Sequence, residues 1–110
     1  MSMYGNYNLA QAGKSQFLTV DGTSDTLTMS SNIQGLWFYS TQDCWIKIGT
    51  GTVVAVKPSA QKVVTDSFFL PANTIKETNV PASTDEKPCV IAAIQDSASG
   101  NLHVMEWNLS

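Results

Sequence analysis

The stretch VIAAIQDSASGNLHVMEW, residues 90–107, carries the clearest fold signal in the chain. It begins with the near-continuous apolar run Val90–Gln95, which is typical of a strand buried on both faces. It ends with Leu102–Trp107, in which small apolar side chains alternate with other residues at the period of two that a strand requires. Between the two runs lie small and polar residues, including Gly100, which suits a turn that needs a positive φ. The pattern predicts that the two segments pair with each other as a β-hairpin.

The rest of the chain has the same β-rich character. Thr, Val and Ile together number 26 and the aromatic residues add ten, so a third of the 110 residues favour a pleated sheet. Helix formers never accumulate over a helix-length window, and Ser, Asn, Gly and Pro interrupt the chain at short intervals. Further strands are expected at residues 16–20, 26–30, 35–40, 44–48, 52–56, 63–64, 68–70 and 75–80. The sequence therefore predicts an all-β fold, a two-sheet antiparallel β-sandwich of jelly-roll type.

The domain organisation expected from this pattern is one β-sandwich at residues 15–110, preceded by an extended N-terminal arm at residues 1–14. The arm is polar and has no period, with Tyr4, Tyr7 and Leu9 as scattered apolar anchors. Such a segment is either a solvated tail or an arm that becomes ordered on a partner.

The charge balance argues against two classes of partner. The chain has six lysines, no arginine and nine acidic residues, for a net charge of −3, which is unsuited to gripping a phosphate backbone. The longest apolar run, Val90–Ile94, is far shorter than a membrane helix, and no signal peptide is seen. We therefore expect that the chain binds neither nucleic acid nor membranes. We also expect that it is synthesised in a reducing cytoplasm. Cys44 and Cys89 are then expected to be buried free thiols, with a disulfide between them as the open alternative.

The sequence offers no convincing catalytic or metal-binding group. His103 is the sole histidine, so one chain cannot supply a catalytic triad or a site with several histidines. The spacing of Cys44, Cys89 and His103 matches no zinc pattern. Asp21 and Asp25 flank a glycine turn that lacks the ligand order of a calcium loop, which favours a capped turn. We expect no enzyme activity, no metal and no cofactor.

The aromatic residues are the remaining candidates for function. Trp37, Phe38 and Tyr39 are consecutive and cannot all face one core, so one side of that strand is expected to be exposed. Trp37 and Tyr39, together with Tyr4, Tyr7 and Leu9 of the arm, are the candidate partner-binding residues. An exposed aromatic patch suits either a protein partner or a sugar ring, whereas packing under a second layer would give it a purely structural role.

Three stretches taken together resemble a known group of proteins. They are WIKIG at 45–49, FLPAN at 69–73 and VIAAIQDSASGNLHV at 90–104. Their order and spacing resemble small virion proteins of tailed bacteriophages, and among these the capsid decoration, or staple, proteins of epsilon15-like short-tailed phages. The resemblance covers about residues 36–107, and the ending Met105–Trp107 and the charged loop at 85–87 depart from it.

This resemblance implies a structural virion protein without catalytic residues. Such a protein would be assembled in the host cytoplasm and bound on the outer surface of an icosahedral head. There it would bridge and stabilise subunits of the major capsid protein, with self-association as a homodimer. The alternative is a carbohydrate- or receptor-binding β-sandwich of a phage tail or head fibre. A sugar site predicts one or two isolated aromatic residues beside Asp or Asn, whereas a cement protein predicts a broader apolar patch and an arm.

Overall fold

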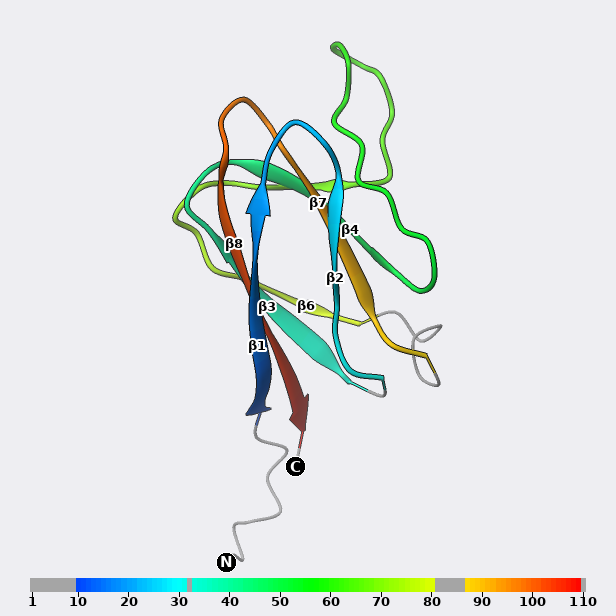
Figure 1. Cartoon of the computed structure of the whole chain (residues 1–110), viewed down its shortest axis with the longest axis vertical. Coiled ribbons are helices and arrows are strands. Elements are labelled where there is room, and N and C mark those ends of the chain that lie inside the picture. Colours follow the sequence, from blue (N-terminus) through cyan, green and yellow to red (C-terminus); the bar gives the residue numbers. More distant parts are fainter. Residues whose placement is uncertain (1–9, 32, 81–86, 110) are drawn as a thin grey trace, which may run out of the picture.

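The computed structural model describes residues 10–31, 33–80 and 87–109, which form eight strands and no helix. The strands are β1 (Ala10–Val20), β2 (Asp25–Thr28), β3 (Gly35–Ser40), β4 (Cys44–Gly49), β5 (Phe68–Leu70), β6 (Lys76–Asn79), β7 (Val90–Gln95) and β8 (Gly100–Leu109). They form two antiparallel four-stranded sheets, ordered β1-β8-β3-β6 and β2-β7-β4-β5, which pack face to face (Figure 1). The predicted β-sandwich is confirmed, and this strand order is that of a jelly roll.

The core lies between the sheets and is built from alternate residues of each strand. Leu36 and Phe38 of β3 face inward from the first sheet, and Ile46 of β4 and Ile91 of β7 face them from the second, all fully buried. A strand side chain points to the opposite face from its neighbour, so burying these residues turns the intervening ones outward.

Cys44 and Cys89 are both buried and free, as expected. Cys44 is paired in register with Gln95, six positions along the chain from Cys89. At about 3.3 Å per residue the two cysteines lie about 20 Å apart, beyond the reach of a disulfide. The alternative of an internal disulfide is therefore wrong.

The hairpin predicted at residues 90–107 is also wrong, although both of its strands exist. β7 pairs with β2 and β4 in the second sheet, whereas β8 pairs with β1 and β3 in the first. The connection between them crosses from one sheet to the other, because each strand is central in its own sheet and has two neighbours already.

Gly100 is needed for a different reason from the positive φ that was predicted. Among the described glycines only Gly51 has a positive φ. A Cβ at position 100 would lie 2.8 Å from side-chain atoms of Thr41 and Gln42, so this position needs glycine for space.

The first strand is longer than the sequence pattern suggests. β1 begins at Ala10, which pairs with Leu109, and its register shifts between Ala12 and Ser15. Residues 10–14, assigned from their polarity to the arm, thus form the first part of β1. The anchors proposed for the arm, Tyr4, Tyr7 and Leu9, lie outside the described residues.

The long connection between β4 and β5 covers the outer face of the second sheet. The strands expected at 52–56 and 63–64 do not form. Instead, Val53 and Ala55 pack against Val90 and Ala92 of β7, making a small second core. This cover explains why β7 is apolar on both of its faces.

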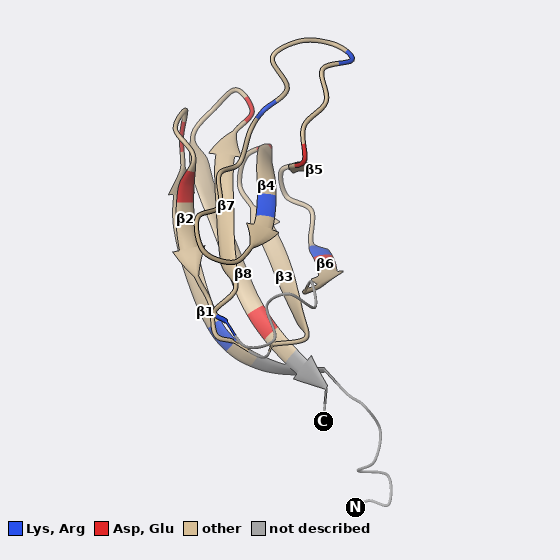
Figure 2. Ribbon diagram, turned by 90° about the vertical axis from the view of Figure 1, so that its right-hand side faces the viewer, with Lys and Arg blue, Asp and Glu red and all other residues tan. Residues whose placement is uncertain are grey.

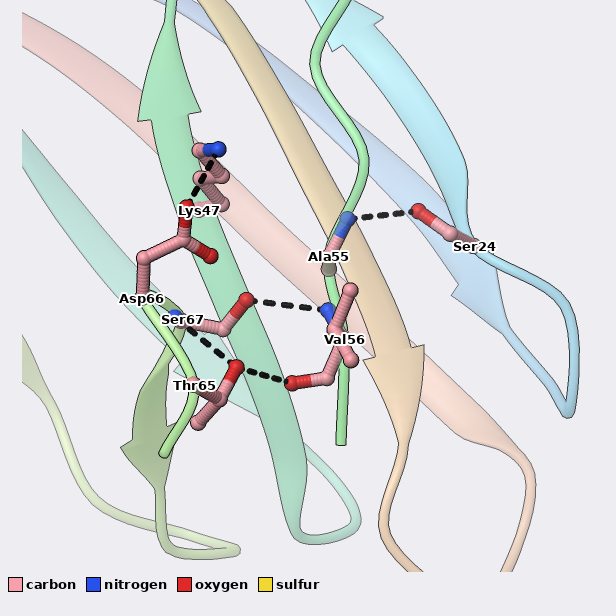
Figure 3. Close-up of polar contacts among 7 residues, drawn as sticks. All are labelled: Ser24, Lys47, Ala55, Val56, Thr65, Asp66 and Ser67. Carbon is pink, nitrogen blue, oxygen red and sulfur yellow. Dashed lines mark hydrogen bonds and ion pairs between the residues drawn. The ribbon is translucent and has the colours of Figure 1, made fainter. Parts of the chain in front are cut away.

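Polar contacts hold the cover in place (Figure 3). The backbone N–H of Ala55 donates to Ser24 Oγ at 2.9 Å, and that of Val56 donates to Ser67 Oγ at 2.9 Å. The chain therefore covers the outer face of its second sheet with its own residues.

Candidate docking face

The outer face of the first sheet has no comparable cover among the described residues, and it is rich in aromatic side chains. We call it the aromatic face. Its members are Phe17, Trp37, Tyr39, Ile75, His103 and Met105, which line a groove of about 610 Å³. A soluble protein seldom exposes a continuous apolar surface of this kind unless something binds there.

The register of the strands aligns these side chains in rows. Phe17 of β1 pairs with His103 of β8, which in turn pairs with Tyr39 of β3. Two residues further along β8, Met105 pairs with Trp37 of β3. Because paired residues share a face of the sheet, the odd-numbered residues of β3, of β8 and of β1 from Ser15 onward form one continuous surface.

His103 lies in the middle of this surface, between two rings. Its ring centroid is 5.8 Å from that of Phe17 and 6.5 Å from that of Tyr39. Phe17 and Ile75, at the two borders, are 61% and 73% exposed, and His103 between them is exposed as well. The exposed ring of His103 and the exposed apolar side chains at the borders are therefore the parts of this face that a partner could cover.

The polar atoms of the two central aromatic residues already have partners. The Trp37 indole Nε1 donates to Glu77 Oε2 at 2.6 Å, and the Tyr39 hydroxyl donates to Asn73 Oδ1 at 2.9 Å. These bonds hold both rings against the sheet. A partner that covers them therefore leaves no buried donor unpaired, which would otherwise be costly.

Trp107 continues the aromatic row toward the end of β8. Its ring lies 6.1 Å from that of Trp37 and covers Gly35, where a Cβ would stand 2.1 Å from the indole. Position 35 therefore accepts only glycine without a shift of the tryptophan. The side chain is buried, and its Nε1–H has no hydrogen-bond partner among the described residues.

The structure places two of the five predicted binding residues, Trp37 and Tyr39, on this face, both half-buried. The other three fall outside the described residues. The sequence pattern missed Phe17 and Ile75 and considered His103 only as a catalytic residue or a metal ligand. The alternation of residues in β8 could have indicated this face, because it already placed His103 and Met105 on the side of the strand that points away from the core.

The remaining candidates for chemistry are not brought together. His103 is on the outer face, whereas both cysteines are inside the sandwich, so the three cannot share a zinc ion. Asp21 Oδ1 accepts the backbone N–H of Thr23 at 2.9 Å, which is the capped turn favoured by the sequence. Within the described part of the chain, no cluster of three metal-ligating side chains occurs.

A second, smaller aromatic pair lies on the other sheet. Trp45 of β4 and Phe69 of β5 have ring centroids 5.2 Å apart. The Trp45 Nε1 donates to Asp96 Oδ1 at 3.0 Å, and the same oxygen lies 3.7 Å from Lys57 Nζ. The polar groups beside this pair are thus engaged within the chain.

No protein-family model, curated protein or solved structure matches this chain. Among the residues that the structure describes, none belongs to a helix long and apolar enough to cross a membrane. The functional inference therefore rests on the chemistry of the surface and on the resemblance noted in the sequence.

Proposed function

We propose that this chain is a structural protein that docks on another protein through its aromatic face. More specifically, we propose a capsid decoration protein, bound on the outside of an icosahedral phage head and cementing subunits of the major capsid protein. The observation that carries the proposal is the asymmetry of the sandwich. The 50–67 connection covers one outer face, whereas the aromatic face is apolar and open.

The composition of the face favours a protein partner. Trp, Tyr and Met are enriched at protein interfaces, and binding energy concentrates on a few large side chains at their centre. Here Trp37 and Tyr39 are already held in place by Glu77 and Asn73, so little conformational freedom is lost on docking.

The other side chains are consistent with a role without catalysis. Burial raises the pKa of both thiols, and for Cys89 the carboxylate of Glu106 raises it further. A thiol with a raised pKa is a poor nucleophile. A cement protein needs no nucleophile, only a rigid scaffold with adhesive surfaces.

The alternative of a carbohydrate-binding module is less well supported. A sugar ring needs an aromatic platform with free hydrogen-bonding groups beside it. At the Trp45–Phe69 pair, Asp96 already accepts from Trp45 and lies near Lys57. The aromatic face, in turn, is broad and continuous, as expected of a surface that meets a protein.

The test is co-sedimentation of the purified chain with heads of the encoding phage prepared without it. We expect saturable binding, and we expect Phe17→Thr to weaken it at least about fivefold, because truncating an interface anchor costs more than about 1 kcal/mol. The matched control is Phe69→Thr, which changes an exposed phenylalanine of the other sheet and should leave binding unchanged.

Two outcomes would contradict the proposal. If the wild-type chain is folded by circular dichroism and does not bind heads, the decoration role is wrong. If Phe17→Thr and Phe69→Thr weaken binding equally, the aromatic face is not the docking surface. Binding of the chain to a glycan array instead would favour the carbohydrate alternative.

A further inference from the structure

The connection between β4 and β5 contains a loop, residues 57–66, that projects beyond the strands (Figures 1 and 2). Its base is fixed by polar contacts (Figure 3). Thr65 Oγ1 donates to the carbonyl oxygen of Val56 at 2.6 Å and accepts the N–H of Ser67 at 3.2 Å. Asp66 forms an ion pair with Lys47 of β4, with 2.6 Å between Nζ and Oδ2. The two ends of the loop are therefore tied to each other and to the second sheet.

The tip of this loop is apolar and open to solvent. Val64 is 93% exposed and Val63 is 46% exposed. The N–H of Val63 donates to the carbonyl oxygen of Ala60 at 3.3 Å, which closes a turn. Within that turn Lys62 has a φ of 66°, a left-handed conformation that is unfavourable for a residue with a side chain. Packing within the chain explains neither the exposed valines nor the strained lysine.

The charged residues of the loop are Lys57, Lys62 and Asp66, and Asp66 is already paired with Lys47 of β4. The charge of Lys57, at the base of the loop, is already paired, because its Nζ forms an ion pair with Asp96. Among the described residues Lys62 has no ion-pair partner, so the tip presents two valines beside an unpaired positive charge.

We propose that this tip, Lys62 to Val64, is a second docking site, which inserts into an apolar pocket with an acidic rim on a neighbouring capsid subunit. The inference rests on the proposed function and extends it. The aromatic face belongs to the first sheet, whereas the loop is anchored on the second. A chain with two separate contact sites can bridge two subunits, and the two contacts reinforce each other through effective concentration.

A protein pocket suits the tip better than a lipid surface does. Segments that insert into membrane interfaces rely on Trp, Phe or Leu together with several basic residues. This tip has only two valines and one unpaired lysine. Because the base of the loop is fixed, the loop loses less conformational freedom when it binds, which favours docking into a protein pocket.

The decisive experiment uses the double variant Lys62→Glu with Val64→Ser on heads prepared without the chain. A matched control, Val54→Ser with Lys87→Glu, makes the same changes at exposed positions away from the tip. Head binding is measured by co-sedimentation, and head rupture is followed by DNA release on heating. We expect the tip variant to bind at least about fivefold more weakly and, at full occupancy, to give no protection against rupture. The control should match the wild type in both measurements.

A second variant separates the side chain from the backbone strain. Lys62→Gly keeps the left-handed turn, because glycine adopts it freely. We expect it to unfold at a higher temperature than the wild type and still to bind more weakly.

The outcomes distinguish this inference from the proposed function. Equal protection by the tip variant and the wild type at equal occupancy overturns the second docking site and leaves the aromatic face in place. Failure of the wild type to bind heads overturns both. If instead the wild type binds vesicles containing anionic lipid and the tip variant does not, the tip contacts membranes and the inference is wrong.

Discussion

At the residue scale, the buried thiol of Cys89 couples stability to alkaline pH. Burial, with a smaller contribution from the Glu106 carboxylate, raises the pKa of Cys89 from its ordinary value of 9.0 to about 11. Between these values the unfolded chain loses the thiol proton and the folded chain retains it. Unfolding is therefore increasingly favoured as the pH rises through this window, and the stabilisation present below pH 9 is lost.

We expect the free energy of unfolding, measured by urea denaturation from pH 8 to 11, to fall less steeply with pH in Cys89→Ala than in the wild type. All other side chains are common to the two proteins, so the difference between the two slopes isolates the cysteine. Parallel slopes would mean that Cys89 ionises as readily in the folded protein as in the unfolded chain. A thiol reagent should modify Cys89 much faster after unfolding.

At the scale of elements, the cover over the second sheet depends on a few hydrogen bonds. Val53 and Ala55 do not belong to a strand, so no sheet partner satisfies their backbone. The Ala55 N–H is instead held by the hydroxyl of Ser24, from the turn between β1 and β2.

We expect Ser24→Ala to destabilise the protein by about 1 kcal/mol, because it leaves a partly buried N–H without its acceptor. Hydrogen exchange of the Ala55 amide should become faster, while that of Val56, held by Ser67, changes less. The control is Thr23→Ala in the same turn, which retains the hydrogen bond from the backbone N–H of residue 23 to Asp21 Oδ1. Unchanged exchange at Ala55 would show that the apolar contacts of Val53 alone hold the cover.

At the scale of the whole molecule, we expect residues 1–9 to contribute to docking. An arm that becomes ordered on a partner increases the buried area at an entropic cost. Because β1 begins at Ala10, deletion of residues 1–9 keeps every described strand, whereas a longer deletion would remove pairs with β8.

We expect this deletion to leave the circular dichroism spectrum unchanged and to weaken binding to heads. The matched variant replaces Tyr4, Tyr7 and Leu9 with serine and keeps the length of the chain. A similar loss in both proteins would identify these side chains as the anchors. Wild-type affinity in both would show that the arm is a solvated tail.

Local pattern accounts for the strands that were predicted well. Gly35–Ser40 and Val90–Gln95 have the predicted bounds, because their β-branched and aromatic residues have no competing turn signal. The hairpin failed for a physical reason. A short loop of small residues can close a hairpin or cross between sheets, and only the pairing of the other strands decides which.

The same limit applies to the candidate site. Trp37 and Tyr39 could be singled out because three consecutive aromatic residues cannot all face one core. Phe17 and Ile75 could not, because each is an ordinary apolar residue until its neighbours across the sheet are known. The exposed tip at Val64 was likewise read as a short strand, since two adjacent valines favour strands in isolation.

Residue types and their spacing predicted the all-β class, the two sides of alternating strands such as β8, and free thiols as the favoured state of the two cysteines. These follow from residue type and a period of two, which are local properties. The pairing of the strands, and which outer face is covered and which stays open, could be seen only in the folded chain. Those features depend on contacts between residues far apart in the chain, and local preference does not encode them.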